Sequence, residues 1–242
     1  MKDRADRLLV TLGLFESRAG ARAAIEAGRV RVDGVTLTKP AQEVSPDSQI
    51  EADPAHPYVS RGGLKLARGL EVFGVDPTGR TCLDIGASTG GFTEVLLLAG
   101  AKHVVAVDVG RGQLHPRIAV DPRVTSFEAT DARNLTADML GGAPDLLVCD
   151  ASFISLEKLL EVPLSLAAPG AAFVGLFKPQ FQVGREHVGK GGIVTDVAQA
   201  DAAAARFEAW MKEKGWPIHA WTASPISGGD GNAERLFHAI RA

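Results

Sequence analysis

The pattern of hydrophobic and polar residues predicts one kind of structure before residue 60 and another after it. In the first part, Leu8, Leu9 and Leu12 recur at helical spacing. Ser17 can cap a second short helix, and Gly28 is placed to end it. The chain is therefore predicted to begin with two small helices.

A β-hairpin is predicted to follow. In residues 30–37, valine and leucine flank the dipeptide Asp33-Gly34 on both sides, and this is the strongest short hairpin signal. Basic residues are frequent in the helices and the hairpin, and they indicate a positively charged surface. A solvated basic face on a small helical cap is the alternative. The positions concerned are Arg18, Arg22, Arg29, Arg31 and Lys39.

Short β-rich runs alternate with helical patterns in the second part of the chain. This alternation predicts an α/β fold with a mostly parallel, doubly wound sheet, whose ligands bind at the carboxyl ends of the strands. Prolines punctuate residues 53–59, which we interpret as a linker between a domain at 1–52 and one at 60–242. The predicted strands lie near 81–85, 103–108, 124–128, 145–149, 171–177, 218–223 and 235–240.

Composition excludes several classes of protein. Of the 242 residues, 45% are hydrophobic and 23% are charged, which is typical of a globular protein and excludes a disordered one. The longest uncharged stretch, residues 162–177, is too short to span a membrane, and the first residues mix acids with bases, unlike a secretory signal. We therefore expect a cytoplasmic protein with no membrane partner. Cys82 and Cys149 lie in apolar runs, so we expect buried thiols and no metal site.

A candidate cofactor site follows the first strand of the second domain. Gly86 and Gly90 let the backbone approach a ligand, and Asp108 ends the next strand, where a carboxylate can bind both hydroxyls of a ribose. This spacing alone would equally suit NAD. Asp84, however, would repel a pyrophosphate, whereas it suits the positively charged methionine end of S-adenosylmethionine. The acid therefore favours S-adenosylmethionine.

The same turn resembles the first motif of class I methyltransferases. The resemblance places Asp108 at the ribose and Asp131 at the adenine. For Asp131, the alternative is a carboxylate that only caps a turn. The cofactor contacts that the resemblance implies are Asp84, Gly86, Ala87, Ser88, Thr89, Gly90, Gly91, Phe92, Asp108, Asp131 and Asp150.

Four charged residues form a candidate catalytic group. Asp150 ends the fourth strand and Lys178 the fifth, and adjacent strand ends should bring their side chains together. Lys65 lies on a helix that Ser60 can cap. Glu234 precedes the last strand and reaches the same cleft if that strand runs antiparallel. Two ordinary salt bridges beside a cleft are the alternative interpretation.

Several motifs together resemble the TlyA (haemolysin A) family of ribosomal RNA 2′-O-methyltransferases over nearly the whole chain. They are Arg18 to Arg22, Gly28 to Gly34, Ser60 to Leu66, Asp84 to Phe92, Asp150 to Leu156 and Lys178 to Phe181. The resemblance implies a small α+β S4-like RNA-binding domain, followed by an FtsJ-like domain of the class I (Rossmann-like) methyltransferase fold. That fold has a mostly parallel seven-stranded sheet with helices on both faces.

The resemblance also implies a reaction and its participants. The cofactor would be S-adenosylmethionine, the acceptor a ribose 2′-hydroxyl of ribosomal RNA, with cytidine expected, and the partner ribosomal RNA or a ribosomal subunit. The family's catalytic tetrad would be Lys65, Asp150, Lys178 and Glu234. We expect a monomer with no protein partner. The residues expected to contact RNA are Arg4, Arg18, Arg22, Arg29, Arg31, Arg61, Lys65, Arg185 and Lys190.

The chemistry of 2′-O-methylation suits these side chains. A ribose hydroxyl is a weak nucleophile, so its attack needs a base or a cation that stabilises the alkoxide. Lys178 could serve in either role, with Asp150 and Glu234 orienting the lysines and Lys65 tuning the charge or contacting RNA. Base methylation is disfavoured, because the residues after Asp150 lack the double proline of amino-group methyltransferases.

Two alternative functions rank below this one. A ribosome assembly factor that binds RNA without catalysis is the alternative, and the presence of all four candidate catalytic residues argues against it. A membrane-lytic haemolysin ranks last, because the sequence has neither a membrane span nor a long amphipathic basic helix.

Overall fold

The computed structural model describes residues 2–242. The chain divides into two compact units, which meet in the sequence between Pro57 and Tyr58. Each unit has its own hydrophobic core.

The amino-terminal unit contains two helices and two small antiparallel sheets. Ser17 caps the second helix, since its hydroxyl accepts a hydrogen bond from the backbone N–H of Gly20 (3.2 Å), which confirms the predicted cap. The first helix ends before Leu12, whose side chain is exposed. The elements are β1 (Asp3–Arg4), α1 (Ala5–Thr11), α2 (Arg18–Glu26), β2 (Val30–Val32), β3 (Val35–Thr36), β4 (Glu43–Val44) and β5 (Ile50–Ala52), paired as β1–β4 and β3–β2–β5.

The predicted hairpin is confirmed. Asp33 and Gly34 both adopt positive φ angles, 51° and 79°, as a type I′ turn requires. An aspartate tolerates this conformation better than most residues, and glycine has no side chain to oppose it. The turn joins β2 to β3 in antiparallel register.

The carboxy-terminal unit is a seven-stranded sheet between helices. Its helices are α3 (Gly62–Phe73), α4 (Gly91–Leu98), α5 (Pro116–Ala119), α6 (Ala137–Leu140), α7 (Leu156–Leu166) and α8 (Val197–Glu213). Its strands are β6 (Thr81–Ile85), β7 (His103–Val107), β8 (Val124–Phe127), β9 (Leu146–Cys149), β10 (Ala172–Phe177), β11 (Ile218–Ala223) and β12 (Arg235–Ile240). Short 3-10 helices lie at η1 (Ala132–Asn134), η2 (Pro179–Phe181), η3 (Arg185–His187) and η4 (Lys190–Gly192).

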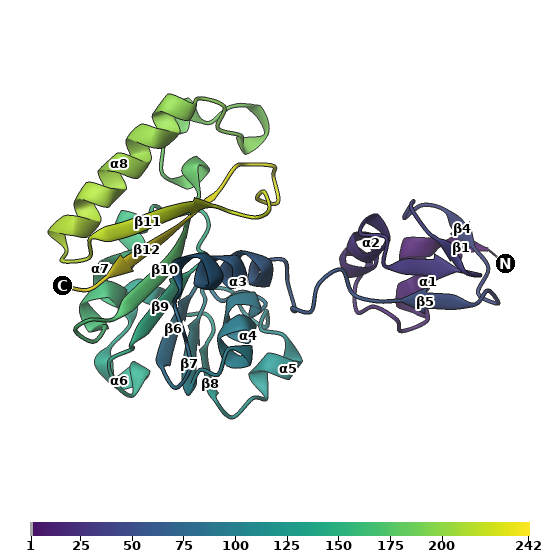
Figure 1. Cartoon of the computed structure of the whole chain (residues 1–242), viewed down its shortest axis with the longest axis horizontal. Coiled ribbons are helices and arrows are strands. Elements are labelled where there is room, and N and C mark those ends of the chain that lie inside the picture. Colours follow the sequence, from purple (N-terminus) through teal and green to yellow (C-terminus); the bar gives the residue numbers. More distant parts are fainter. Residues whose placement is uncertain (1) are drawn as a thin grey trace. The chain divides into compact units, whose positions relative to one another are not determined.

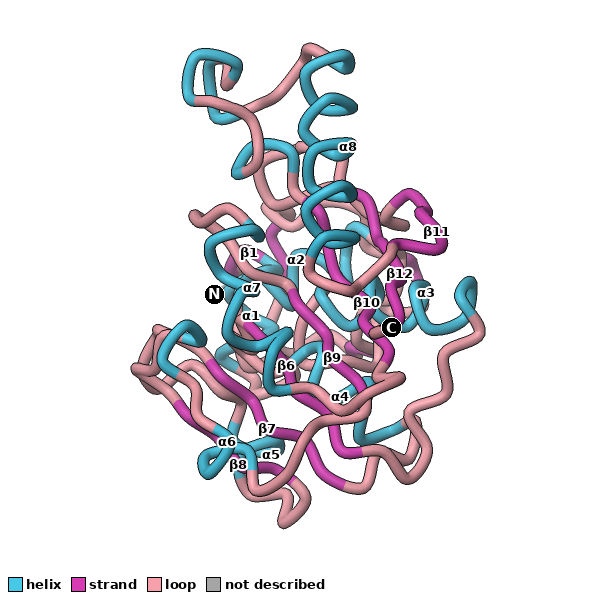
Figure 2. Tube along the Cα trace, turned by 90° about the vertical axis from the view of Figure 1, so that its left-hand side faces the viewer, coloured by secondary structure: helices cyan, strands magenta, loops and turns pink. Residues whose placement is uncertain are grey.

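The strands follow the order β11-β12-β10-β9-β6-β7-β8 across the sheet (Figures 1 and 2). The five strands from β10 to β8 are parallel, while β12 is antiparallel to both of its neighbours. The predicted fold, a mostly parallel seven-stranded sheet, is thereby confirmed. Since parallel strands end at one edge, the loops after β6, β7, β8, β9 and β10 lie on the same side of the unit.

Helices cover both faces of this sheet (Figure 1). Leu66 of α3 and Leu96 of α4 pack in the core on one face, and α5 adds Ile118. On the other face, Leu160 of α7 and Phe207 of α8 pack against the strands. Cys82 and Cys149 are buried free thiols, as expected, and burial raises the pKa of each to about 12.

The predicted capping of α3 by Ser60 is wrong. The residue at the N-cap position is Arg61, whose backbone is already helical, and no side chain caps this end. The backbone oxygen of Ser60 instead accepts from the N–H of Gly63 (3.1 Å). The Ser60 hydroxyl lies against Gly91, at the start of α4. The serine thus packs two helix ends together.

Within residues 2–242, no helix is long and apolar enough to cross a membrane.

Candidate active site

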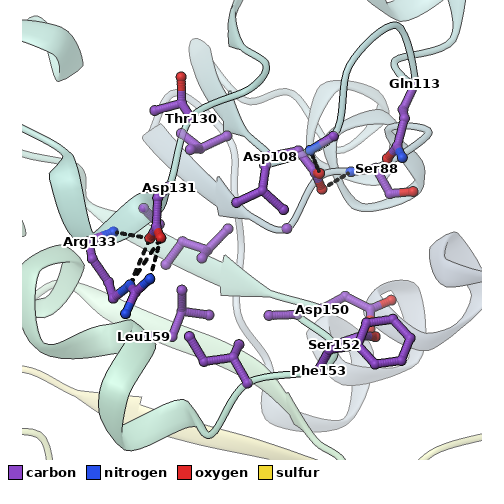
Figure 3. Close-up of a pocket in the computed structure, with 18 residues that line it drawn as sticks. Ser88, Asp108, Gln113, Thr130, Asp131, Arg133, Asp150, Ser152, Phe153 and Leu159 are labelled. Carbon is purple, nitrogen blue, oxygen red and sulfur yellow. Dashed lines mark hydrogen bonds and ion pairs between the residues drawn. The ribbon is translucent and has the colours of Figure 1, made fainter.

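Three cavities lie at the carboxyl ends of the parallel strands. The first, of about 600 Å³, is lined by the loops that follow β6, β7, β8 and β9 (Figure 3). The second, of about 280 Å³, lies between residues 60–62, the glycine turn and Lys178. The third, of about 320 Å³, is lined by Lys65, Lys178 and Glu234 among others. Ser152 lines all three cavities, so they adjoin at this residue.

The turn between β6 and α4 requires its glycines. Gly86 has a φ of 82°, and a Cβ there would lie 3.1 Å from the Cα of Ala151. Gly90 has a φ of 90°, and a Cβ there would lie 2.8 Å from Leu114. The turn therefore passes close to the loop after β9, and this approach forms the wall shared by the first two cavities.

Residues of this turn divide between the cavities. Gly86 and Ser88 line both the first and the second. Asp84 and Gly90 line none of the three, since Asp84 lies beneath the turn and Gly90 packs on α5. The predicted contacts that line only the second cavity are Ala87, Thr89, Gly91 and Phe92.

Asp84 is fully buried at the end of β6. One carboxylate oxygen, Oδ2, accepts a hydrogen bond from the Thr93 hydroxyl (2.6 Å). The other, Oδ1, is buried and has no partner within the described residues. Burial raises the pKa of Asp84 to about 7, with the bond from Thr93 opposing the rise and the nearby Asp150 adding to it. Oδ1 is therefore a buried acceptor that the described residues leave unsatisfied.

Asp108 and Asp131 face the first cavity from the loops after β7 and β8 (Figure 3). Asp108 accepts hydrogen bonds from the backbone N–H groups of Ser88 (2.8 Å) and Gly110 (2.7 Å), which fix its carboxylate at the wall. Asp131 pairs with Arg133 and caps η1, and the hydrogen bonds from Arg133 lower the pKa of Asp131. The capping role considered for Asp131 is therefore real, and its side chain also borders the cavity.

Lys178 and Asp150 meet as the adjacency of their strands predicts. The ammonium nitrogen of Lys178 lies 2.6 Å from Oδ1 of Asp150. It also donates to the Ser152 hydroxyl (2.8 Å) and to the backbone oxygen of Asp150 (3.5 Å). Only 9% of the lysine side chain is exposed. One ion pair and two hydrogen bonds thus hold the Nζ atom at the junction of the second and third cavities.

Lys65 pairs with Glu234 in the third cavity. Their Nζ and Oε2 atoms lie 2.5 Å apart, and both side chains are buried. Glu234 reaches this position because β12, which it precedes, runs antiparallel to β10. The four candidate catalytic residues therefore form two separate ion pairs around adjoining cavities, Lys178 with Asp150 and Lys65 with Glu234.

Two residues near this site were not singled out from the sequence. Ser152 binds Lys178 and lines all three cavities. Phe153 is 90% exposed, has a φ of 66° and lines the first and third cavities beside Phe181, at 5.1 Å between ring centroids. The sequence signal for both residues is their place in the motif that begins at Asp150. The positive φ of Phe153 is a separate, structural signal, since backbone strain gathers at functional sites.

The candidate RNA contacts outside Lys65 are exposed, but several are already paired. Arg4 and Arg18 bind Asp6, and Arg22 binds Glu26. In the other unit, Arg61 donates to the backbone oxygen of Ser227 (3.1 Å) and lines the second cavity. The side chains of Arg29, Arg31, Arg185 and Lys190 are exposed. The sequence pattern does not indicate that the carboxylates of Asp6 and Glu26 pair with three of these candidate arginines.

Comparison with known proteins identifies the family. The FtsJ-like methyltransferase family matches residues 58–241, and the S4 domain family matches residues 3–50. The chain belongs to the FtsJ-like methyltransferases and carries an S4 domain. The resemblance to the TlyA family is also confirmed by the relatives that follow.

Three similar proteins match almost the whole chain. It is 46% identical over 233 residues to the 16S/23S rRNA (cytidine-2′-O)-methyltransferase TlyA of Mycobacterium tuberculosis, a match covering 96% of this chain and 87% of that protein. Hemolysin A of Brachyspira hyodysenteriae is 38% identical, covering 98% and 99%. A solved Streptococcus thermophilus protein with a provisional hemolysin name superposes with a TM-score of 0.78 at 38% identity, covering 100% and 89%.

Proposed function

We propose that this protein transfers a methyl group from S-adenosylmethionine to the 2′-hydroxyl of a cytidine in ribosomal RNA. The observation that carries the proposal is the meeting of Lys178, Asp150 and Ser152 where all three cavities adjoin. The cytidine and the ribosomal substrate follow the name of the relative from Mycobacterium tuberculosis.

The residues of the first two cavities fit S-adenosylmethionine. Beneath the turn that borders both cavities, the orphaned Oδ1 of Asp84 would suit a cationic amino group, and the carboxylate of Asp108 at the wall of the first cavity suits the hydroxyls of a ribose. Asp131, between β8 and α6, would border the adenine. A volume of about 600 Å³ is within the range of pockets for small molecules and cofactors. When bound, this cofactor supplies a methyl group on a sulfonium sulfur.

Lys178 would act on the hydroxyl of the RNA. An ammonium has three N–H donors and no acceptor, and the oxygens around Nζ suit that form. We infer that Lys178 stabilises negative charge as it develops on the 2′-oxygen, while the hydroxyl proton passes to water. Asp150 and Ser152 hold the ammonium in place. Stabilisation by a fixed, largely buried charge avoids reorganisation during the reaction.

Lys65 and Glu234 would complete the acceptor side of the site. Their buried pair places a second ammonium in the third cavity, which Lys178 also lines. We infer that the target ribose and its phosphates occupy this cavity, with Glu234 orienting Lys65. In the same proposal, residues 1–52 bind RNA, residues 53–59 are a linker, and residues 60–242 carry out catalysis. The RNA contacts are those expected from the sequence.

The test is transfer of labelled methyl groups to naked ribosomal RNA and to isolated small and large subunits. We expect label at ribose 2′-oxygens with the wild-type chain. Lys178→Ala should reduce turnover by about 10²- to 10³-fold, with cofactor affinity retained. Lys158→Ala removes an exposed lysine of α7 and serves as the matched control.

Two outcomes would contradict the proposal. Turnover that survives in Lys178→Ala would refute the role of this lysine. Absence of label on every substrate, with cofactor binding intact, would favour the assembly factor that binds RNA without catalysis.

A further inference from the structure

One buried carboxylate stands out in the amino-terminal unit. Among the charged side chains of residues 2–57, only Asp6 is buried, with 3% of the residue exposed. Asp6 lies in the first turn of α1. Hydrogen bonds from Arg4 and Arg18 lower its pKa, so it is charged throughout the physiological range.

Asp6 binds two arginines from different elements. Its Oδ1 accepts from Nε of Arg4 (3.0 Å), and its Oδ2 accepts from Nη2 of Arg4 (3.1 Å) and from Nη2 of Arg18 (2.8 Å). Arg4 belongs to β1, whereas Arg18 is the first residue of α2. The carboxylate therefore fixes two guanidinium groups next to each other.

Both guanidinium groups keep donors available for another partner. An arginine carries five N–H donors, of which these bonds occupy two on Arg4 and one on Arg18. The side chains of Arg4 and Arg18 are 46% and 59% exposed. The buried side of the cluster faces Asp6, and the remaining donors are accessible to an anion.

The cluster differs from the other ion pairs of this unit. Asp3 pairs with Arg7 and Glu26 with Arg22, each one to one. Of these three groups, the Asp6 cluster alone retains a net positive charge, because one carboxylate serves two cations. A cation is also disfavoured at the N-terminus of a helix, which is the position of Arg18. The stability of α2 therefore does not explain why an arginine lies there.

We propose that Asp6 is a positioning residue for RNA binding, holding Arg4 and Arg18 so that together they bind phosphates of one RNA strand. The inference rests on the proposed function, in which this unit binds RNA. Fixing the arginines before RNA arrives reduces the side-chain entropy lost on binding, which is otherwise substantial for long side chains.

This proposal and a simple charge argument predict effects of opposite sign. Asp6→Asn removes a negative charge beside the bound phosphates, and on charge alone RNA affinity should rise. If Asp6 positions the arginines, the same substitution should weaken binding, because both side chains become free to move. The direction of the change therefore separates the two accounts.

The experiment measures the binding of the full chain to ribosomal RNA and to isolated subunits at several salt concentrations. We expect Asp6→Asn to raise the Kd about tenfold and to reduce its salt dependence. Asp3→Asn is the matched control, since it removes the same charge beside the same end of α1; it releases the guanidinium of Arg7 and alters a bond to the backbone N–H of Arg4, but frees neither guanidinium of the Asp6 cluster. The control should bind as tightly as the wild-type chain or more tightly. Wild-type affinity or tighter binding in Asp6→Asn would overturn the inference.

A double-mutant cycle covers the case in which Asp6→Asn does not fold. Arg4→Ala and Arg18→Ala, singly and together, leave Asp6 in place. Two arginines held by one carboxylate should show non-additive losses of RNA affinity, whereas independent contacts would give additive losses, which would refute the inference. Failure of the wild-type chain to bind any RNA would instead remove the proposed function, and the inference with it.

Discussion

The affinity of this protein for S-adenosylmethionine should depend on the charge of Asp84. The carboxylate is fully buried, and its pKa is raised to about 7. A cationic amino group is attracted to the charged form only, so cofactor binding should tighten as the pH rises through 7. The charged fraction of an acid with a pKa of about 7 rises about tenfold between about pH 6 and about pH 8. We therefore expect the dissociation constant to fall about tenfold over this range, which corresponds to about 1.4 kcal/mol.

Isothermal titration with S-adenosylhomocysteine provides the assay. This ligand has the amino group but no sulfonium charge, so it isolates the interaction with Asp84. Thr93→Val removes the hydrogen bond that lowers the pKa of Asp84, and the pH dependence should move to higher pH. Asp84→Asn should abolish the pH dependence and weaken binding. The control Asp138→Asn, at an exposed position of α6, should leave both unchanged. The same affinity for wild-type protein at pH 6 and pH 8 would refute the reasoning.

The sign of the stability change gives an independent check. An acid whose pKa is higher in the folded chain than in the unfolded one stabilises the fold only at low pH. The contribution of Asp84 is lost as the pH rises from the ordinary aspartate range towards 7. At pH 8 without cofactor, Asp84→Asn should therefore raise the free energy of unfolding, by at most about 4 kcal/mol for a pKa rise from 3.8 to about 7. Denaturant unfolding measures this, and a lower stability would contradict it.

Two further predictions concern the catalytic residues. Ser152→Ala should lower kcat about tenfold, because Lys178 loses a neutral hydrogen-bond partner; Ser165→Ala, at an exposed position of α7, is the control, and an unchanged kcat would argue against positioning by Ser152. Glu234→Gln should lower kcat and, by leaving the charge of Lys65 buried without its carboxylate, reduce the free energy of unfolding by about 3 kcal/mol. Glu157→Gln breaks an exposed pair with Arg206 and should cost about 0.5 kcal/mol at most, so equal losses would contradict the burial argument.

The positions of the strands and their mostly parallel arrangement could be predicted from the sequence, whereas most side-chain partners could not. Asp150 and Lys178 meet because they follow the neighbouring parallel strands β9 and β10, which end at the same edge of the sheet. The distance between these two strand ends is set by the pairing of the backbones. Glu234 was conditional, because no periodicity distinguishes a parallel from an antiparallel last strand. Only the pairing of β12 with β10 settles that its carboxylate faces Lys65.

Other features depend on packing that the sequence does not specify. Ser60 has the residue type of a helix cap, but the backbone of Arg61 is already helical and the hydroxyl packs against Gly91. Asp6 appeared as one acid among several, whereas the docking of α2 on α1 makes it the partner of Arg18. In both cases the local pattern is compatible with two arrangements, and contacts between distant residues decide which one forms.

The charges of the site explain why a separate RNA-binding surface is needed. Lys178 with Asp150 and Lys65 with Glu234 are two cations and two anions, so their charges cancel. The chain as a whole carries a formal net charge of −3. Neither these four candidate catalytic residues nor the total charge would then draw RNA towards the third cavity at long range.

In the proposed function, the long-range attraction of RNA would therefore come mainly from residues outside these two ion pairs. A catalytic ammonium that remains largely buried against its carboxylate is fixed in position but attracts phosphate weakly, because the pair is neutral from a distance. Exposed arginines have the opposite properties, since they attract phosphate but lack a fixed position. The cluster of Asp6 with Arg4 and Arg18 combines a fixed geometry with a net positive charge. It would thereby supply what the neutral candidate catalytic pairs lack, and the proposed function would use the S4 domain for affinity and the FtsJ-like methyltransferase domain for chemistry.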